Sequence, residues 1–254
     1  MLERKNYIIN IDLERLNEID EKLVRLNAKV EKNREKFEDL LETSRFVYTY
    51  NSNGIEGNTL NLEETIKAIA GEEIQDKWPN EMVEAINHYK AVRNIENLAK
   101  DNTEITEEVI KGTHEIILNE INIFEAGYYR CKNVMIVGAM NMPPSYDKVP
   151  DEMKRMLEEY PSWLNYHPII RAALLHGELV FIHPFIDGNG RTSRLMMNLE
   201  LEKAGFLPVI VKKEKRYVYY DALDKANNEK DYTDFINILL EEENNILDMY
   251  LELM

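Results

Sequence analysis

Residues 183–194 read HPFIDGNGRTSR, and this stretch decides the fold of the 254-residue chain. The apolar run LLHGELVFI (174–182) precedes it, and RLMMNLELEKAG (194–205) begins at its last residue, Arg194. Both runs are typical of buried helices. Pro184 disfavours helical geometry at the residue before it, so the first helix should end at His183. The stretch therefore predicts two helices joined by a loop, with Gly188, Asn189 and Gly190 opening the second helix.

This loop has the residues of a phosphate site. Backbone N–H groups at a helix N-terminus, with the positive end of the helix dipole behind them, bind anions. Arg191 and Arg194 are three residues apart and share one face, and since arginine opposes the dipole there, we expect both to serve a ligand or a carboxylate. Asp187 can hold Mg²⁺, with Mn²⁺ as an alternative, between phosphates. Histidine is the side chain that ordinarily titrates near neutrality, which makes His183 a candidate general base.

Together these residues predict phosphoryl or nucleotidyl transfer. The loop is not a Walker loop, because no Gly-Lys-Ser/Thr follows the glycines. Phe185 and Ile186 alternate with the polar residues, and we expect them to anchor the loop in the core.

The rest of the chain predicts an all-α fold. Only 10 Gly and 8 Pro interrupt it, which favours long helices. The apolar spacing predicts helices at 13–45 (with a break near 27–33), 60–70 (capped by Asn61), 80–100, 105–120 (capped by Thr106), 150–165, 168–181, 191–204, 214–227 and 231–252. Residues 127–149 break the pattern, and the run VMIV (134–137) predicts a short strand pair or flap. We expect an N-terminal helical segment (1–75) packed on a larger helical unit (76–254).

Charge and composition exclude several classes of protein. The chain has 31 Lys and Arg against 47 Asp and Glu, a net charge of −16, which disfavours binding to nucleic acid or anionic lipid. The first residues, MLERKNYIINIDLERL, have no apolar core for a signal peptide or a membrane span. One cysteine, Cys131, excludes an internal disulfide. No helix-turn-helix follows residue 205, and KKEKR (212–216) is typical of a solvated helix start. We expect a cytoplasmic protein.

At every defined position, residues 183–194 resemble the signature His-x-Phe-x-Asp/Glu-Gly-Asn-Gly-Arg-x-x-Arg of the Fic (filamentation induced by cAMP) family. The resemblance extends over about 80–240. It implies an all-α fold with a β-hairpin flap, and transfer of AMP from ATP to a Ser, Thr or Tyr hydroxyl of another protein. It also implies that His183 takes the hydroxyl proton and that Asp187 holds Mg²⁺. The phosphates would be cradled by Gly188, Asn189, Gly190 and Arg191, with Arg194 at the γ-phosphate.

Two further segments resemble parts of Fic sites. The run Val134, Met135, Ile136 and Val137 is similar to the flap, which pairs with the main chain of the target. Tyr219, Tyr220 and Asn227 resemble the wall that contacts adenine and ribose. The alternative for YVYYDAL is a stripe of helical core residues. Beside the flap, Arg130 and Lys132 would add positive charge to the phosphate site.

An upstream motif implies autoinhibition. In SNGIEGNTL, the residues Ser52, Glu56 and Gly57 resemble the family's inhibitory motif, Ser/Thr-x-x-x-Glu-Gly/Asn. There the glutamate pairs with the second motif arginine, here Arg194. Such a carboxylate would pair with the arginine that binds the γ-phosphate and would fill the space that the γ-phosphate needs. The alternative is that Glu56 is an ordinary loop acid.

Other functions use the same residues. The site could remove AMP from a modified protein with the help of Glu56, or transfer another phosphate-linked group such as UMP or phosphocholine. A regulator that binds nucleotide without turnover is a third alternative, but it would not need His183. The stripe over 13–45 is compatible with a homodimer, and so with auto-AMPylation, or with packing inside one chain. The target protein and its modified residue are not visible in the sequence.

Overall fold

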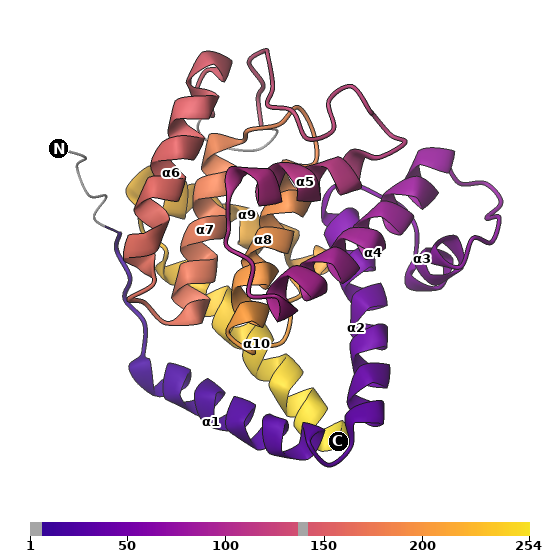
Figure 1. Cartoon of the computed structure of the whole chain (residues 1–254), viewed down its shortest axis with the longest axis vertical. Helices are drawn as coiled ribbons and strands as arrows, with labels where there is room; N and C mark the ends of the chain where they lie inside the picture. The colour runs from indigo at the N-terminus through magenta and orange to yellow at the C-terminus, as the bar shows by residue number, and fades with distance from the viewer. Residues whose placement is uncertain (1–6, 137–141) are drawn as a thin grey trace.

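The computed structural model describes residues 7–136 and 142–254, and the described part is all-α apart from one isolated bridge (Figure 1). Its helices are α1 (Leu13–Val30), α2 (Arg34–Ile55), α3 (Leu62–Ile69), α4 (Pro79–Lys100), α5 (Glu107–Leu118), α6 (Val149–Trp163), α7 (Pro168–Ile182), α8 (Asn189–Lys203), α9 (Arg216–Glu229) and α10 (Thr233–Leu253). Two 3₁₀ turns, η1 (Tyr146–Lys148) and η2 (Lys213–Lys215), precede α6 and α9. The predicted all-helical class is confirmed.

Helices α7 and α8 form the centre of the molecule. They pack on each other, with α4 and α5 against α8 and with α6, α9 and α10 against α7 (Figure 1). Most of α7 and nearly all of α8 are buried, including polar residues such as His176, Glu178 and Arg194. Buried polar side chains need partners or a function, so the residues of this central pair carry the site.

Local capping explains why several helices begin where the sequence predicts. The predicted break after α1 is real, and Asn33 starts α2 by accepting a hydrogen bond from the Lys36 N–H at 3.2 Å. Asn61 forms a capping box with Glu64 at the start of α3. Thr106 caps α5 through the Val109 N–H at 3.3 Å. These ends are set by neighbouring residues, which is why the pattern alone finds them.

The two N-terminal helices pack on adjacent sides of the central unit. Helix α1 runs along α10 at the bottom of Figure 1, and α2 packs on α4 and α8. Polar contacts fix α2: Ser44 and Tyr250 share a hydrogen bond of 2.8 Å, and Arg45 pairs with Glu96 at 2.6 Å. A division between 1–75 and 76–254 stays a prediction, since α1 and α2 share one apolar core with the other helices.

The predicted strand pair is not found in the described part of the flap segment. Residues 134–136 and 142–145 form neither helix nor strand, and the remaining flap residue, Val137, lies outside the described residues. The one bridge in the described part joins Ile8 to Asp231 in parallel. Strand pairing needs a partner at the right register, and the run VMIV alone does not provide one.

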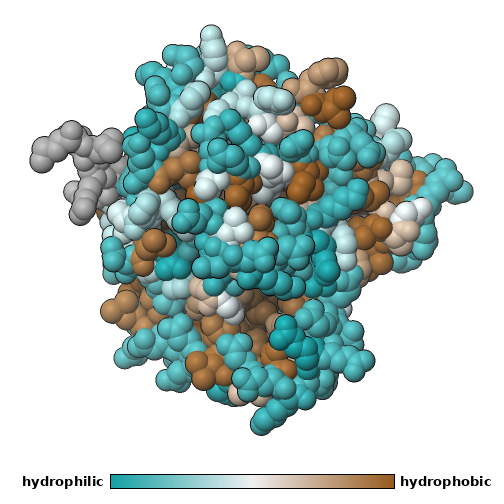
Figure 2. Space-filling view, in the orientation of Figure 1, coloured by the Kyte–Doolittle hydropathy of each residue, from teal (hydrophilic) through white to brown (hydrophobic). Residues whose placement is uncertain are grey.

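The surface agrees with the acidic composition. Hydrophilic side chains dominate the face in Figure 2, and the apolar side chains form separate small patches. Within residues 7–136 and 142–254, every helix is too short or too polar to cross a membrane.

Candidate functional site

The loop between α7 and α8 is shaped by its own residues. Helix α7 ends at Ile182, and His183 is left-handed (φ 49°, ψ 58°), in agreement with the effect of Pro184. Gly188 is also left-handed, at φ 74°, and precedes α8 as its N-cap. The Asn189 side chain spans the loop, accepting from the Phe185 N–H and donating to the Phe185 carbonyl, both at 2.9 Å. The predicted loop at a helix N-terminus is therefore confirmed, with the Asn189 side chain bonded to the loop itself.

The underside of the loop rests on α5. Phe185 is buried, as predicted, and its ring stacks on the ring of His114 at 3.6 Å between centroids. His114 Nε2 donates to the Asp187 carbonyl at 2.9 Å, while Nδ1 accepts from the Gly127 N–H at 2.9 Å. Our sequence reasoning missed His114. The available signal was its position on the apolar face of α5 with Ile110 and Ile117.

His183 has the protonation state of a general base. Burial lowers the pKa of its imidazole to about 4, with a smaller lowering from the Arg130 guanidinium. The ring is therefore neutral at pH 7 and can accept a proton. Arg130 is itself buried: its side-chain Nε donates to the His183 carbonyl at 2.8 Å, and its backbone N–H donates to the Pro184 carbonyl at 2.9 Å. Arg130 thus holds the main chain of the loop, and its charge acts on His183 from there.

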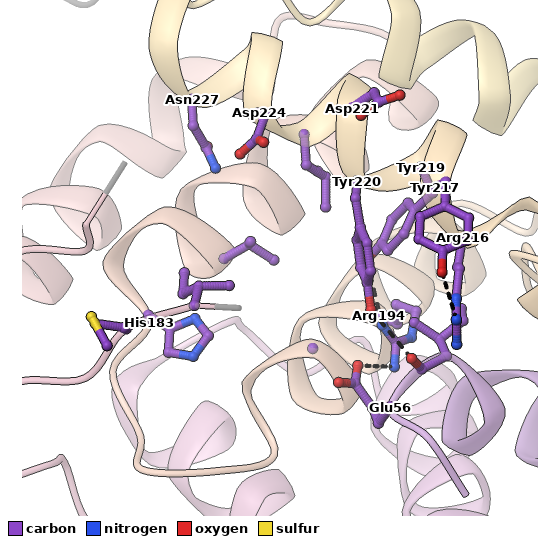
Figure 3. Close-up of a pocket in the computed structure, with 16 residues that line it drawn as sticks. Glu56, His183, Arg194, Arg216, Tyr217, Tyr219, Tyr220, Asp221, Asp224 and Asn227 are labelled. Atoms are coloured by element: carbon purple, nitrogen blue, oxygen red, sulfur yellow. Dashed lines mark hydrogen bonds and ion pairs between the residues drawn. The ribbon is translucent and has the colours of Figure 1, made fainter. Parts of the chain in front are cut away.

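Arg194 and Glu56 form the predicted pair (Figure 3). Arg194 is fully buried in α8, and its Nη2 lies 2.7 Å from Glu56 Oε1 at the C-terminus of α2. The same guanidinium donates from Nη2 to the Ser52 carbonyl at 2.9 Å and from Nε to Ser52 Oγ at 3.0 Å. Burial is the largest single effect and disfavours its charged form, but Glu56 and Tyr219 together outweigh it and raise the pKa of Arg194. Ser52 and Glu56 therefore both serve this buried cation.

Two glycines allow α2 to approach α8 and its surroundings. A Cβ on Gly190 would overlap Glu56 Oε1 and lie 3.1 Å from Arg194 Nη1. A Cβ on Gly54 would lie 2.6 Å from Cδ of Lys213 in η2. Gly57, the last residue of the predicted inhibitory motif, has φ of 100° and lets the chain turn away after Glu56. The Glu56 carboxylate thus lies directly against the first turn of α8.

The first motif arginine is paired as well. Arg191 is buried and lies 3.3 Å from Glu84 of α4 and 3.5 Å from Asp187. Glu84 also accepts a hydrogen bond of 2.8 Å from the Asn58 amide, just beyond the inhibitory motif. Both arginines thus bind carboxylates of the chain itself, in line with the expectation from the dipole. Nothing in the sequence around Glu84 indicates this role.

A cavity of about 540 Å³ joins the predicted residues. Glu56, Gly190 and Arg194 line one end, and His183 lies across the cavity from them (Figure 3). Met135 and Ile136 of the predicted flap also line it, whereas Val134 does not. Helix α9 supplies the third wall through Tyr219, Tyr220, Asp221, Asp224 and Asn227. Sequence reasoning missed Asp221, Asp224 and Arg216; the spacing 220, 224, 227 of one helix face was the signal for Asp224.

The three predicted residues of α9 play different parts. Tyr219 is buried, and its hydroxyl lies 2.8 Å from His176 Nε2 and 3.4 Å from Arg194 Nη1, so it supports the arginine. Tyr220 is about one-third exposed and its hydroxyl donates to the Ile55 carbonyl at 3.2 Å. Asn227 Oδ1 is buried without a hydrogen-bond partner in the described part of the chain. A buried unpaired amide oxygen on a cavity wall is suited to a ligand.

The predicted metal residue stands apart from other ligands. Asp187 has 64% of its side chain exposed, and its Oδ1 accepts from the Gly188 N–H at 2.6 Å. Within the described ranges, no three His, Cys, Asp or Glu side chains gather as a metal centre. Mg²⁺ is often held by one or two carboxylates and the phosphates of a substrate. The single carboxylate therefore fits a metal ion that enters with a nucleotide.

Comparison with known proteins gives matches along nearly the whole chain. The model of the Fic/DOC family matches residues 104–201. A Drosophila grimshawi protein named protein adenylyltransferase Fic is 35% identical over 253 residues, 97% of this chain and 51% of the relative. The structure of Caenorhabditis elegans Fic-1 (residues 134–508) has a TM-score of 0.83 and 31% identity, covering 96% of this chain and 72% of that one. A Fic family protein of Desulfovibrio desulfuricans has a TM-score of 0.81 and 26% identity, with coverage of 98% and 77%. The chain spans about half the length of the curated relatives that it matches.

Proposed function

This chain belongs to the Fic/DOC family, and we propose that it is a protein adenylyltransferase that transfers AMP from ATP to a hydroxyl of another protein. The observation that carries the proposal is one cavity in which a neutral His183 faces Arg194, while Glu56 covers that arginine. The relatives that match most of the chain have the name of this activity. Substrate class and regulation follow from the same residues.

His183 would act as the general base. Its neutral imidazole takes the proton of a Ser, Thr or Tyr hydroxyl, and the oxygen attacks the α-phosphorus of ATP. The bond from the α-phosphorus to the bridging oxygen breaks, so AMP stays on the protein and pyrophosphate leaves. Arg191, Arg194 and the free N–H groups at the start of α8 would stabilise the phosphate charge.

Asp187 would hold the metal ion that accompanies ATP. Mg²⁺ bound there would neutralise charge on the phosphates and orient the leaving group. The chain's own contribution is the position of the carboxylate, which the Gly188 N–H fixes at the N-terminus of α8.

Glu56 would inhibit transfer in the state that the structure shows. Its carboxylate pairs with Arg194, the residue that would bind the γ-phosphate. The same carboxylate oxygen, Oε1, also fills the space next to Gly190. ATP can then bind productively only after α2 or the Glu56 side chain moves. The flap residues Met135 and Ile136, at the cavity, would hold the segment that contains the target hydroxyl.

Labelled ATP tests this function. We expect Glu56→Gly to incorporate ³²P into protein from α-labelled ATP and none from γ-labelled ATP, since AMP retains only the α-phosphate. The double variant Glu56→Gly/His183→Ala should incorporate neither label. Equal and negligible labelling of a broad lysate by Glu56→Gly and the double variant would refute the proposal. Competition by UTP or CDP-choline distinguishes transfer of UMP or phosphocholine.

Removal of AMP is the second candidate, because Glu56 lines the same cavity as His183. A carboxylate there can orient a water molecule toward a modified side chain. A target first labelled by Glu56→Gly and then treated with the wild-type chain should release AMP, whereas Glu56→Gln should release none. An untouched label after wild-type treatment excludes this second activity.

A further inference from the structure

His114 lies beneath the loop that carries Asp187, outside the lining of the cavity. Its side chain is completely buried in α5, and its ring stacks on Phe185 with an angle of 5° between the planes. The Asp187 carbonyl can only accept and the Gly127 N–H can only donate, so the two backbone partners fix the neutral tautomer with hydrogen on Nε2. One ring thus makes three directed contacts with the loop and with the start of the flap segment.

The ring also packs against the first turn of α8. A Cβ on Gly188 would lie 3.3 Å from both Cδ2 and Nε2 of His114. The Asp187 main chain is therefore held by α5, while its carboxylate is 64% exposed. The Gly188 N–H holds Oδ1 of that carboxylate at 2.6 Å. The backbone of the residue is fixed from one side, and its carboxylate is presented to solvent on the other.

We propose that His114 is a positioning residue that holds the Asp187 carboxylate in place for a metal–nucleotide complex. Residues behind a metal ligand orient it and strengthen metal binding. Because Gly127 begins the segment 127–149 that contains the predicted flap, the same ring ties the start of this segment to the loop between α7 and α8. The inference rests on the proposed function, since that function supplies the metal–nucleotide complex.

Two substitutions separate hydrogen bonding from packing. His114→Phe keeps an aromatic ring on Phe185 but leaves the Asp187 carbonyl and the Gly127 N–H unpaired. His114→Gln keeps an N–H at the distance of Nε2 but loses the ring. The matched control is His88→Asn, another fully buried histidine, whose Nδ1 lies 3.1 Å from Thr49 Oγ1. An asparagine amide can replace that contact.

The measurement is the Mn²⁺ affinity of the complex with a non-hydrolysable ATP analogue, from the electron paramagnetic resonance signal of free Mn²⁺. All variants are made in the Glu56→Gly background. We expect His114→Phe to weaken Mn²⁺ binding about tenfold, the lower end of effects seen behind metal ligands. We expect His114→Gln to stay within about threefold and His88→Asn to equal the parent, and the apparent KM for Mg²⁺ should rise more than kcat falls in His114→Phe.

Several outcomes would overturn the proposal. These are unchanged Mn²⁺ affinity in folded His114→Phe, a larger loss in His114→Gln than in His114→Phe, or a parent complex that holds Mn²⁺ no better than the free analogue. If His114→Phe does not fold, His114→Asn replaces it, because its amide is too short to reach Asp187 and the same loss is expected. A parent that binds Mn²⁺ and the analogue but transfers no AMP would refute the proposed function and leave this test intact.

Discussion

Neutralising Glu56 should destabilise the protein and make ATP a stronger stabiliser. Glu56→Gln keeps the size of the side chain but leaves the buried Arg194 guanidinium without its counter-charge. Removing one partner of a buried ion pair costs about 3–5 kcal/mol. Here the loss should be smaller, about 1–2 kcal/mol, because 35% of the Glu56 side chain is exposed and the Gln amide can still accept a hydrogen bond. Ser52 also keeps its two contacts with Arg194.

This loss can be measured as a melting temperature. For a chain of this size, 1 kcal/mol corresponds to about 2–4 °C, so Glu56→Gln should melt roughly 2–8 °C below the wild type. A γ-phosphate would restore the missing negative charge. At one fixed ATP concentration, about 100 times the Kd of the variant, ATP adds about 2.7 kcal/mol to the stability of the variant. The wild type should gain less at that concentration, because Glu56 competes for Arg194 and raises the Kd of ATP.

AMP provides the control, since it lacks the γ-phosphate and should stabilise both proteins equally. Differential scanning fluorimetry with ATP, AMP and no nucleotide gives all the values. The double variant Glu56→Gln/Arg194→Met removes the unpaired charge and should lose the excess response to ATP. The reasoning is refuted if Glu56→Gln melts at or above the wild-type temperature, or if ATP and AMP shift the two proteins alike.

Three further predictions concern pH, packing and the nucleotide. Because burial lowers the pKa of His183 to about 4, AMP transfer by Glu56→Gly should stay constant from pH 6 to 8 and fall only near pH 4; a midpoint of kcat near 6.5 would contradict this. The histidine is harder to protonate when folded, so the stability it contributes is present above pH 6.5 and is lost as the pH falls toward 4. Gly177→Ala should lower the free energy of unfolding by about 1–3 kcal/mol, because the added Cβ would lie 2.5 Å from the buried ring of Tyr232. Gly112→Ala is the control and should be neutral or stabilising, because no atom lies within 4 Å of its Cβ. Equal urea midpoints for the two variants would refute the packing argument. Asn227→Leu should weaken ATP binding about tenfold and leave tripolyphosphate binding unchanged, both measured by calorimetry. The reason is that the unpaired Oδ1 of Asn227 lies on the α9 wall, away from Arg194. Equal weakening of both ligands would count against a contact of Asn227 with the base or ribose.

The fold was predictable where neighbouring residues decide it. The caps at Asn61 and Thr106, and the loop between α7 and α8, depend on residues within a few positions. The Glu56–Arg194 pair spans 138 residues, and only the resemblance to a known motif predicted it. The strand pair predicted around Val134 is not found in the part of the segment that the structure describes, and β-propensity alone does not provide the neighbouring strand that a pair needs.

The remaining site residues were hidden for a different reason. His114, Glu84 and Arg130 each act on a segment far along the chain, and each sits in an ordinary local context. Arg130 is an example: its place beside the flap predicted added positive charge near the phosphate site, but not the hydrogen bond of its buried guanidinium to the His183 carbonyl. The same charge can serve a ligand or a loop, and only the geometry distinguishes the two.

Two of the chain's many acidic residues pair with the arginines of this site. Arg191 and Arg194 are both buried, and each is paired with a carboxylate from an earlier helix, Glu84 or Glu56. A nucleotide must therefore compete with acids of the chain, which are present at a high effective concentration because they are covalently attached. Glu56 gives Arg194 one oxygen at the exposed end of a helix, whereas a γ-phosphate offers three oxygens and more charge. The balance is thus set by how firmly the end of α2 is held, through contacts such as Asn51 with Lys213 and Asn58 with Glu84. Any interaction that loosens this end should favour the nucleotide over Glu56.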